Sequence, residues 1–251
     1  MALKALIFDV DGTLADTERD GHRPAFNAAF EEYGLDWHWD PALYGQLLAV
    51  TGGKERICYF VEQYLPGDRR PPDPEKIAAE LHPIKTRHYT RLLSEGRIPL
   101  RPGVRRLLTE ARSAGLRLAI ATTTTPANVT ALLHYSLEPG AEAWFDVIAA
   151  GDIVPAKKPA PDIYRWTLQK LGLPPQACLA FEDSGNGMRS SLASGIPTLV
   201  TVNDYTGEDD FSGALLVLSD LGEPDAPFRV LHGDAGDRRM VDLKLLENLR
   251  G

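Results

Sequence analysis

The feature that most constrains this chain is a pair of aspartates directly after its first apolar run. Residues 6–8 are Leu, Ile and Phe, and residues 9–13 read Asp-Val-Asp-Gly-Thr. A short run of β-branched and aromatic residues predicts a buried strand. Ligands bind at the carboxyl ends of strands in an open parallel sheet, and residues two apart on a strand point the same way. We therefore predict that Asp9 and Asp11 face one pocket, where a cation or a shared proton relieves their repulsion.

Length and charge narrow the class of protein. The chain has 251 residues, enough for one large α/β domain or for a core domain with a small second one. Its net charge of −8 argues against nucleic acid or an anionic membrane as a partner. No apolar run approaches the roughly 18 residues that span a bilayer, and the N-terminus lacks a signal-peptide pattern. Cys58 and Cys178 are interpreted as free buried thiols, so we expect a cytoplasmic protein.

A helical segment interrupts the α/β pattern. Apolar residues recur at helical spacing in four segments, at about 25–33, 41–50, 57–65 and 74–92. Strands are expected later in the chain, at 116–121, 145–150, 178–181, 197–202 and 214–218. Residues 228–231 favour a further strand, and 240–249 fit either a strand or a helix. We predict an α/β fold with a doubly wound, mostly parallel Rossmann-like sheet in residues 1–16 and 96–251, and a small inserted α-helical cap domain in residues 17–95.

The turn between the second and third of these helices carries two glycines and two cations. Gly52 and Gly53 permit a tight loop, and Lys54 and Arg56 follow at the start of the next helix. An ordinary interhelical turn with surface charges would show the same pattern. Because an acidic strand end that suits a metal is predicted elsewhere in the chain, we favour a loop that binds phosphate.

Further polar groups follow other predicted strands of the core. Thr122 and Thr123 come after the second strand, where hydroxyl and N–H groups can hold an anion. Lys158 lies in a Lys-Lys-Pro loop, and Glu182 and Asp183 follow the strand at 178–181. Taken alone, the threonines and carboxylates could cap turns and the lysine could be solvated. Together with Asp9, the two later carboxylates form a set of oxygen ligands without His or Cys, which suits Mg²⁺.

The chain thus carries four motifs: the pair of Asp9 and Asp11, then Thr122, then Lys158, and last the pair of Glu182 and Asp183. They resemble the motifs of the haloacid dehalogenase superfamily in its phosphatase form, in the same order and over nearly the whole chain. The resemblance implies that Asp9 is the nucleophile and forms an aspartyl-phosphate, while Asp11 acts as general acid and base. It also implies that Thr122 and Lys158 hold the transferring phosphoryl group. The implied Mg²⁺ ligands are Asp9, Asp11 through its carbonyl, Glu182 and Asp183.

The helical insert is similar to the cap of the β-phosphoglucomutase-like branch, and strings within residues 16–18, 52–56 and 158–162 look most like CbbY-type sugar-bisphosphate phosphatases. This implies a hydrolase of xylulose 1,5-bisphosphate, placed in carbon fixation by the Calvin cycle. The partner would be a small phosphorylated sugar, and the protein a monomer. The substrate-binding candidates are Glu18, His22, Gly52, Gly53, Lys54, Arg56, Thr122, Thr123 and Lys158.

Other functions share these core residues. A sugar phosphomutase differs only in passing the phosphoryl group to sugar rather than to water. His22 aligns with the proton-gating His of the mutases only if one extra residue is allowed, which favours hydrolysis. A phosphatase for phosphoglycolate or sugar monophosphates is also open. A phosphate-binding module without activity is disfavoured, because the residues of all four motifs are intact.

Overall fold

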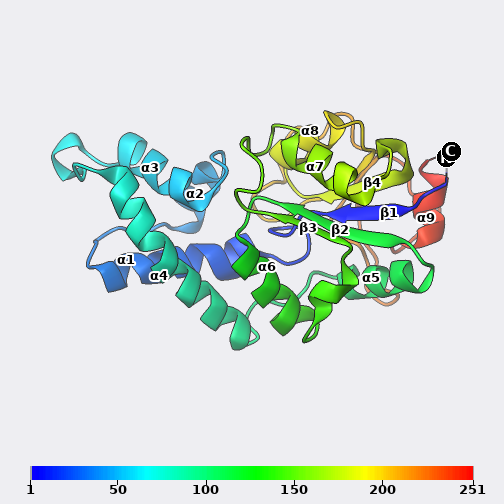
Figure 1. Ribbon diagram of the computed structural model, residues 1–251, viewed down its shortest axis with the longest axis horizontal. Coiled ribbons are helices and arrows are strands. Elements are labelled where there is room, and N and C mark those ends of the chain that lie inside the picture. The colour runs from blue at the N-terminus through cyan, green and yellow to red at the C-terminus, as the bar shows by residue number, and fades with distance from the viewer. Residues whose placement is uncertain (1, 251) are drawn as a thin grey trace. The chain divides into compact units, whose positions relative to one another are not determined.

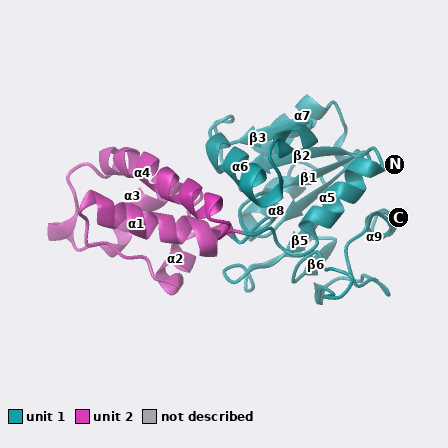
Figure 2. Ribbon diagram, turned by 90° about the horizontal axis from the view of Figure 1, so that it is seen from below, with its two compact units in different colours: residues 1–16, 99–251 teal, residues 17–98 magenta. Residues whose placement is uncertain are grey.

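The computed structural model describes residues 2–250, which fold into two compact units (Figure 2). The first, here called the core unit, contains the chain up to Asp16 and from Pro99 onward. The second, the helical unit, runs from Thr17 to Ile98, slightly beyond the boundary predicted at residue 95. No helix within residues 2–250 is long and apolar enough to cross a membrane.

The core unit is built on a seven-stranded sheet with the strand order β3-β2-β1-β4-β5-β6-β7, counted over the described residues. All pairs are parallel except β6 with β7. The strands are β1 (Ala5–Phe8), β2 (Arg117–Thr122), β3 (Val147–Ala150), β4 (Cys178–Glu182), β5 (Thr198–Thr201), β6 (Leu216–Leu218) and β7 (Val230–His232). The predicted doubly wound, mostly parallel α/β fold is therefore confirmed.

The strand order reverses beside β1, and this reversal positions the site. The chain crosses from β1 to β2 and β3 on one side, and returns to β4, β5 and β6 on the other. Phe8, at the end of β1, pairs with Ile120 of β2 and with Phe181 of β4. The carboxyl ends of these three strands therefore lie level at the topological switch point, where open α/β sheets bind ligands.

Helices cover both faces of this sheet, with α7 and α8 on one side and α5 and α6 on the other (Figure 1). Apolar side chains of β1 alternate between the two faces: Ile7 packs in the cluster beneath α7, while the ring of Phe8 stacks on Phe181 with centroids 4.5 Å apart. The helices are α5 (Val104–Ser113), α6 (Pro126–Leu132), α7 (Asp162–Leu171), α8 (Gly185–Leu192) and α9 (Leu243–Asn248), with short helical turns at Leu133–Leu137, Ala141–Trp144 and Pro175–Ala177.

The end of the chain resolves the open alternatives of the sequence. The strand predicted at 228–231 overlaps β7, which runs from Val230 to His232 as a short antiparallel edge strand. Residues 243–248 are helical, because Asp242 caps that segment by accepting a hydrogen bond from the Leu245 N–H at 2.8 Å. A strand over 240–249 is therefore excluded.

The helical unit contains the predicted helices, with shifted ends. Its helices are α1 (Arg23–Tyr33), α2 (Pro41–Leu47), α3 (Gly53–Tyr64) and α4 (Pro74–Ser94), with a π-helical turn at Glu18–His22 and a 3₁₀ turn at Gly67–Arg69. Asp40 and Asp73 cap α2 and α4 as side-chain acceptors. An aromatic cluster of Phe26, Phe30 and Trp39 forms much of its core. The third helix begins at Gly53, so Lys54 and Arg56 lie in its first turn, at the helix start where the sequence placed them.

Candidate active site

Side chains from three neighbouring strand ends converge at the switch point. Asp9 is the residue after β1, Thr122 is the last residue of β2, and Glu182 is the last residue of β4. The N–H of Asp9 donates to the carbonyl of Phe181 at 3.0 Å, which ties the end of β1 to β4. Lys158 comes from the loop between β3 and α7.

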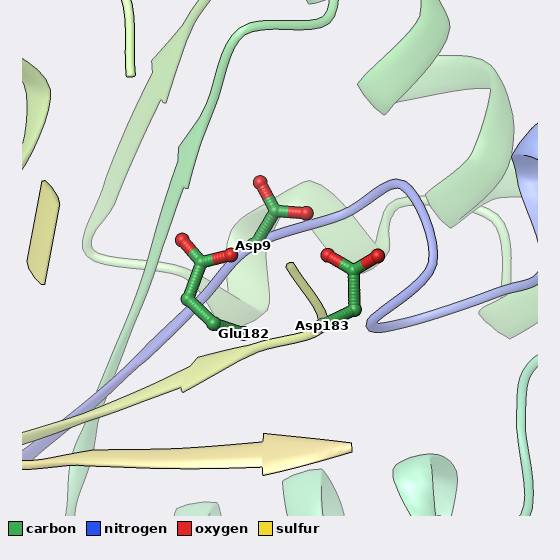
Figure 3. Close-up of side chains that lie close together, drawn as sticks. All are labelled: Asp9, Glu182 and Asp183. Atoms are coloured by element: carbon green, nitrogen blue, oxygen red, sulfur yellow. The ribbon is translucent and has the colours of Figure 1, made fainter. Parts of the chain in front are cut away.

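The carboxylates of Asp9, Glu182 and Asp183 form one buried cluster (Figure 3). One oxygen of each lies within 4.8 Å of an oxygen of both others. The three residues are only 7%, 1% and 6% exposed. Three carboxylates this close need positive charge between them.

Lys158 supplies part of that charge. Its buried ammonium donates to Asp9 Oδ1 and to Glu182 Oε1, both at 2.6 Å. The hydroxyl of Tyr164 on α7 donates to the same oxygen of Glu182. The other Glu182 oxygen, Oε2, is buried and has no hydrogen-bond partner among the described residues. One ammonium therefore bridges two carboxylates, while one buried oxygen of Glu182 keeps its acceptor capacity unused.

The balance of charge shifts the pKa of each group. Burial raises the pKa of Asp9 to about 8; the charge of Lys158 opposes this rise, and the charges of Glu182 and Asp11 add to it. Burial, together with the charges of Asp9 and Glu182, likewise raises the pKa of Asp183 well above its ordinary value. Burial alone would lower the pKa of Lys158, but Asp9 and Glu182 raise it. The cluster thus carries more negative charge than the protein neutralises.

A divalent cation fits this cluster. The donors are all carboxylate oxygens, which suit a hard cation such as Mg²⁺, and a bound cation would reverse the raised pKa values of Asp9 and Asp183. The unpartnered Oε2 of Glu182 offers a further ligand atom. Asp9, Glu182 and Asp183 would hold such an ion.

The turn after β1 requires glycine beside the cluster. Gly12 has φ +85°, and a Cβ there would lie 2.3 Å from Asp183 Oδ2. The Gly12 N–H donates to the carbonyl of Ala15 at 2.8 Å, which closes a tight loop directly after the half-buried Asp11. The Asp-x-Asp-Gly spacing therefore lets β1 and β4 approach each other with Asp11 near Asp9.

Thr122 is 1% exposed and is arranged as a donor. Its Oγ1 accepts a hydrogen bond from the Thr124 N–H at 3.2 Å, which leaves the hydroxyl proton for another acceptor. Thr123 is half-buried in the same turn. These groups stand next to Asp9 in the strand order, on the side opposite Glu182.

The candidates in the helical unit form two clusters of their own. Arg56 is buried; its guanidinium donates to the Tyr44 hydroxyl at 2.8 Å and lies 3.5 Å from Glu18 Oε2. Tyr44 in turn donates to Glu18. Arg56 and Glu18 are therefore held together inside this unit, and their role in substrate binding stays a prediction.

His22 and the glycine turn show further local constraints. The buried His22 Nδ1 lies 2.7 Å from Lys85 Nζ, and the His22 ring stacks on Tyr89. Gly52 has φ +103°, which requires glycine before α3. Lys54 is exposed in the first turn of that helix. Substrate contacts by His22, Gly52, Gly53 and Lys54 also stay predictions.

Three residues that the sequence did not single out support the site. Tyr164 contacts Glu182, and Asn203 donates from Nδ2 to Asp183 Oδ2 at 2.7 Å. Arg101 is 8% exposed and donates to the carbonyl of Gly12, which fixes the turn after β1. An arginine followed by Pro-Gly at the start of the core was a usable signal, whereas the other two carry none in the sequence.

The fold and this site define an α/β enzyme with a buried cluster of carboxylates at the switch point of its sheet. A model of haloacid dehalogenase-like hydrolases matches residues 3–195. The plasmid CbbY protein of Cupriavidus necator is 50% identical over 244 residues, which cover 97% of this chain and 95% of that protein. The chain therefore belongs to the haloacid dehalogenase-like hydrolases and is an enzyme of their phosphatase type.

Solved structures extend this similarity to CbbY. The crystal structure of CbbY from Rhodobacter sphaeroides in complex with phosphate has a TM-score of 0.81 at 47% identity, and the match covers 87% of this chain and 94% of that one. A mutant of that protein in complex with xylulose-(1,5)bisphosphate has a TM-score of 0.81 at 46% identity, with the same coverage. The family and the enzyme class predicted from the four motifs are confirmed.

Proposed function

We propose that this protein hydrolyses xylulose 1,5-bisphosphate to xylulose 5-phosphate with the help of Mg²⁺. The observation that carries the proposal is the contact of Lys158 with Asp9, beside the two carboxylates of β4. This arrangement suits an aspartate that must meet a phosphate dianion. The choice of substrate is supported by the sugar bisphosphate bound to the mutant CbbY structure.

The reaction proceeds in two displacements at phosphorus. A carboxylate oxygen of Asp9 attacks phosphorus, the bond to the sugar oxygen breaks, and Asp11 gives that oxygen a proton. Asp11 then takes a proton from water, whose oxygen attacks phosphorus of the aspartyl-phosphate. The bond between phosphorus and the Asp9 oxygen breaks, which releases inorganic phosphate and restores the Asp9 carboxylate. A bound Mg²⁺ would offset the repulsion between Asp9 and the dianion.

The remaining core residues hold the phosphoryl group. Lys158 neutralises Asp9 and can donate to a phosphoryl oxygen from the same ammonium, which has three hydrogens. Thr122 and Thr123 supply hydroxyl groups on the other side of Asp9. Such donors are worth most where water is excluded, as around this buried cluster.

The second phosphate would be recognised by the helical unit. Lys54 is the leading candidate, since it is exposed and follows the two glycines, Gly52 and Gly53. Arg56 would contribute through the cluster with Glu18, and His22 through its contact with Lys85. In this proposal the unit acts as a cap that closes over bound substrate.

The test is a comparison of phosphate release from xylulose 1,5-bisphosphate, xylulose 5-phosphate, 2-phosphoglycolate and sugar monophosphates, with and without Mg²⁺. We expect the highest kcat/KM for the bisphosphate and loss of turnover without a divalent cation. A monophosphate that is hydrolysed better would contradict the substrate, while activity in a chelator would contradict the metal.

A phosphomutase remains the second candidate, because of one structural observation. Residues 18–22 form a π-helical turn, which accommodates one more residue than an α-helical turn. This turn can absorb the extra residue that separates His22 from the mutase pattern. Isomerisation of β-glucose 1-phosphate, measured beside phosphate release from xylulose 1,5-bisphosphate, distinguishes the two activities.

The biological setting is part of the same proposal. Removal of xylulose 1,5-bisphosphate belongs to carbon fixation by the Calvin cycle. We infer a monomer in the cytoplasm, where the free thiols of Cys58 and Cys178 would stay reduced.

A further inference from the structure

Asn203 lies beside a predicted metal ligand but belongs to none of the four motifs. Its amide Nδ2 donates to Asp183 Oδ2 at 2.7 Å. Asn203 follows β5 by two residues, while Asp183 follows β4, the neighbouring strand. The contact therefore joins the carboxyl ends of the adjacent strands β4 and β5 beside the carboxylate cluster.

The loop of Asn203 fixes which end of its amide faces Asp183. Asn203 Oδ1 accepts a hydrogen bond from the Tyr205 N–H at 2.9 Å, so the oxygen is turned into the loop and the NH₂ group toward the carboxylate. The Asn203 N–H donates to Thr206 Oγ1 at 3.1 Å, and the Thr206 N–H donates back to the Asn203 carbonyl at 3.3 Å. Within residues 203–206, one hydrogen bond thus holds the side chain of Asn203 and two hold its backbone.

Arg101 anchors this loop to the turn that carries the nucleophile. Its guanidinium donates to the carbonyl of Val202 at 2.5 Å and also to the carbonyl of Gly12. A Cβ on Gly12 would lie 2.5 Å from Asn203 Nδ2, so the three segments meet without spare room. The bond of Arg101 to Val202 and the close approach of Gly12 therefore fix the position of Asn203 relative to Asp183.

This contact has a consequence for the metal. A carboxylate can bind an ion through one oxygen or through both. Because Oδ2 of Asp183 accepts the hydrogen bond from Asn203, Oδ1 is the oxygen that stays available to an ion. Mg²⁺ requires short bonds in an octahedral arrangement, to which a carboxylate contributes one oxygen. Ca²⁺ is larger and also accepts bidentate carboxylates, which bind through both oxygens.

We propose that Asn203 is a positioning residue that restricts Asp183 to one metal-binding oxygen and thereby favours Mg²⁺ over Ca²⁺. This inference rests on the metal site of the proposed function, but not on the identity of the sugar substrate. Mutation of a residue that hydrogen-bonds to a metal ligand typically lowers metal affinity by about 10- to 100-fold.

The test compares Mg²⁺ and Ca²⁺ titrations of the full chain without substrate, each followed by the midpoint of thermal unfolding. In Asn203→Ala, we expect the apparent Mg²⁺ affinity to fall by about tenfold and the Ca²⁺ affinity to fall less or to rise. Asn203→Asp keeps the acceptor for the Tyr205 N–H but removes the donor, and it carries the test if the Ala variant does not fold. Asn248→Ala, an exposed site on α9, is the matched control.

The outcomes separate this inference from the proposed function. Equal loss of both affinities would mean a merely structural role for Asn203, and unchanged affinities would mean none; either result overturns the inference. If the wild-type chain binds neither ion, the metal site and the inference fail together. If the ion preference shifts as expected but xylulose 1,5-bisphosphate is not hydrolysed, only the substrate proposal fails.

Discussion

The ammonium of Lys158 donates to Asp9 Oδ1 at 2.6 Å in an environment where both side chains are almost fully buried. The same nitrogen reaches Glu182 Oε1 at 2.6 Å, so one cation holds two carboxylates that come from adjacent strands. The bridge therefore couples the stability of the carboxyl ends of β1 and β4 to the charge of the site.

Replacement of Lys158 should be costly for folding. Lys158→Ala leaves Asp9 and Glu182 buried without their cation, and loss of one partner of a buried ion pair costs about 3–5 kcal/mol. The loss should be smaller at pH 5, because Asp9 is then protonated. Urea unfolding at pH 5 and pH 8 measures both effects. The control is Lys157→Ala, which removes the ion pair with the exposed Asp152 and should cost about 1 kcal/mol or less.

The Asp9→Asn variant should lose activity and gain stability. Loss of a nucleophile lowers kcat by about 10⁴-fold or more. Because burial raises the pKa of Asp9 from 3.8 to about 8, its contribution to stability is present below pH 3.8 and is lost as the pH rises toward 8. The amide of Asn does not ionise, so the variant keeps the stability that the wild type loses when Asp9 ionises. It should therefore unfold at a higher temperature than the wild type at pH 8 without divalent ions. Phosphate release and thermal unfolding check the two parts. Full activity would remove Asp9 as the nucleophile.

Stabilisation by Mg²⁺ should increase with pH. Because the pKa of Asp9 is raised to about 8 and that of Asp183 is also raised, an ion that binds below about pH 8 must displace the proton of Asp9, and it competes with protonation of Asp183 as well. Apparent affinity should therefore rise by about tenfold per pH unit for each proton displaced, between pH 6 and pH 8. Thermal unfolding at several Mg²⁺ concentrations and pH values measures this dependence. A shift that is the same at pH 6 and pH 8 would show that the ion binds elsewhere.

The strand ends were predictable because their causes are local. A parallel strand that is buried on both faces must be a continuous apolar run, and the polar residues that end β1 and β4 stand out against it. The sequence alone therefore predicts that Asp9, Glu182 and Asp183 lie together at the carboxyl ends of parallel strands. The family resemblance implied their roles.

The supporting residues could not be found this way. Asn203 and Tyr164 contact the cluster only because chain segments far apart in sequence meet at the switch point. Arg56 was predicted from its charge as a phosphate ligand, but the sequence gives no sign that Tyr44 and Glu18 surround its guanidinium. Contacts of this kind depend on tertiary packing rather than on local pattern.

The Tyr164 hydroxyl should affect activity more than stability. Tyr164→Phe keeps the buried ring but removes the donor to Glu182 Oε1. A lost hydrogen bond costs about 1 kcal/mol of stability, whereas a group that orients a metal ligand contributes about tenfold or more to activity. The Mg²⁺ dependence of kcat and the unfolding midpoint measure the two effects. Tyr135→Phe, at an exposed tyrosine, is the control, and equal kcat in both variants would contradict a role for the hydroxyl.

The phosphate specificity of the helical unit is best tested at Lys54. If its ammonium binds the second phosphate, Lys54→Ala should raise KM for xylulose 1,5-bisphosphate by about tenfold or more, because a charged hydrogen bond is worth about 1.5–3 kcal/mol. KM for a sugar monophosphate should change little. Arg56→Ala should show the same preference but with lower stability, since Arg56 is buried against Tyr44.

The matched control for Lys54 is Lys76→Ala, which removes an exposed lysine from the first turn of α4 in the same unit. Its KM values for both substrates should equal those of the wild type. Steady-state kinetics with the two substrates at saturating Mg²⁺ provide the comparison. If Lys54→Ala raises both KM values equally, the turn at Gly52–Gly53 does not read the second phosphate, because a specific contact must discriminate between the substrates.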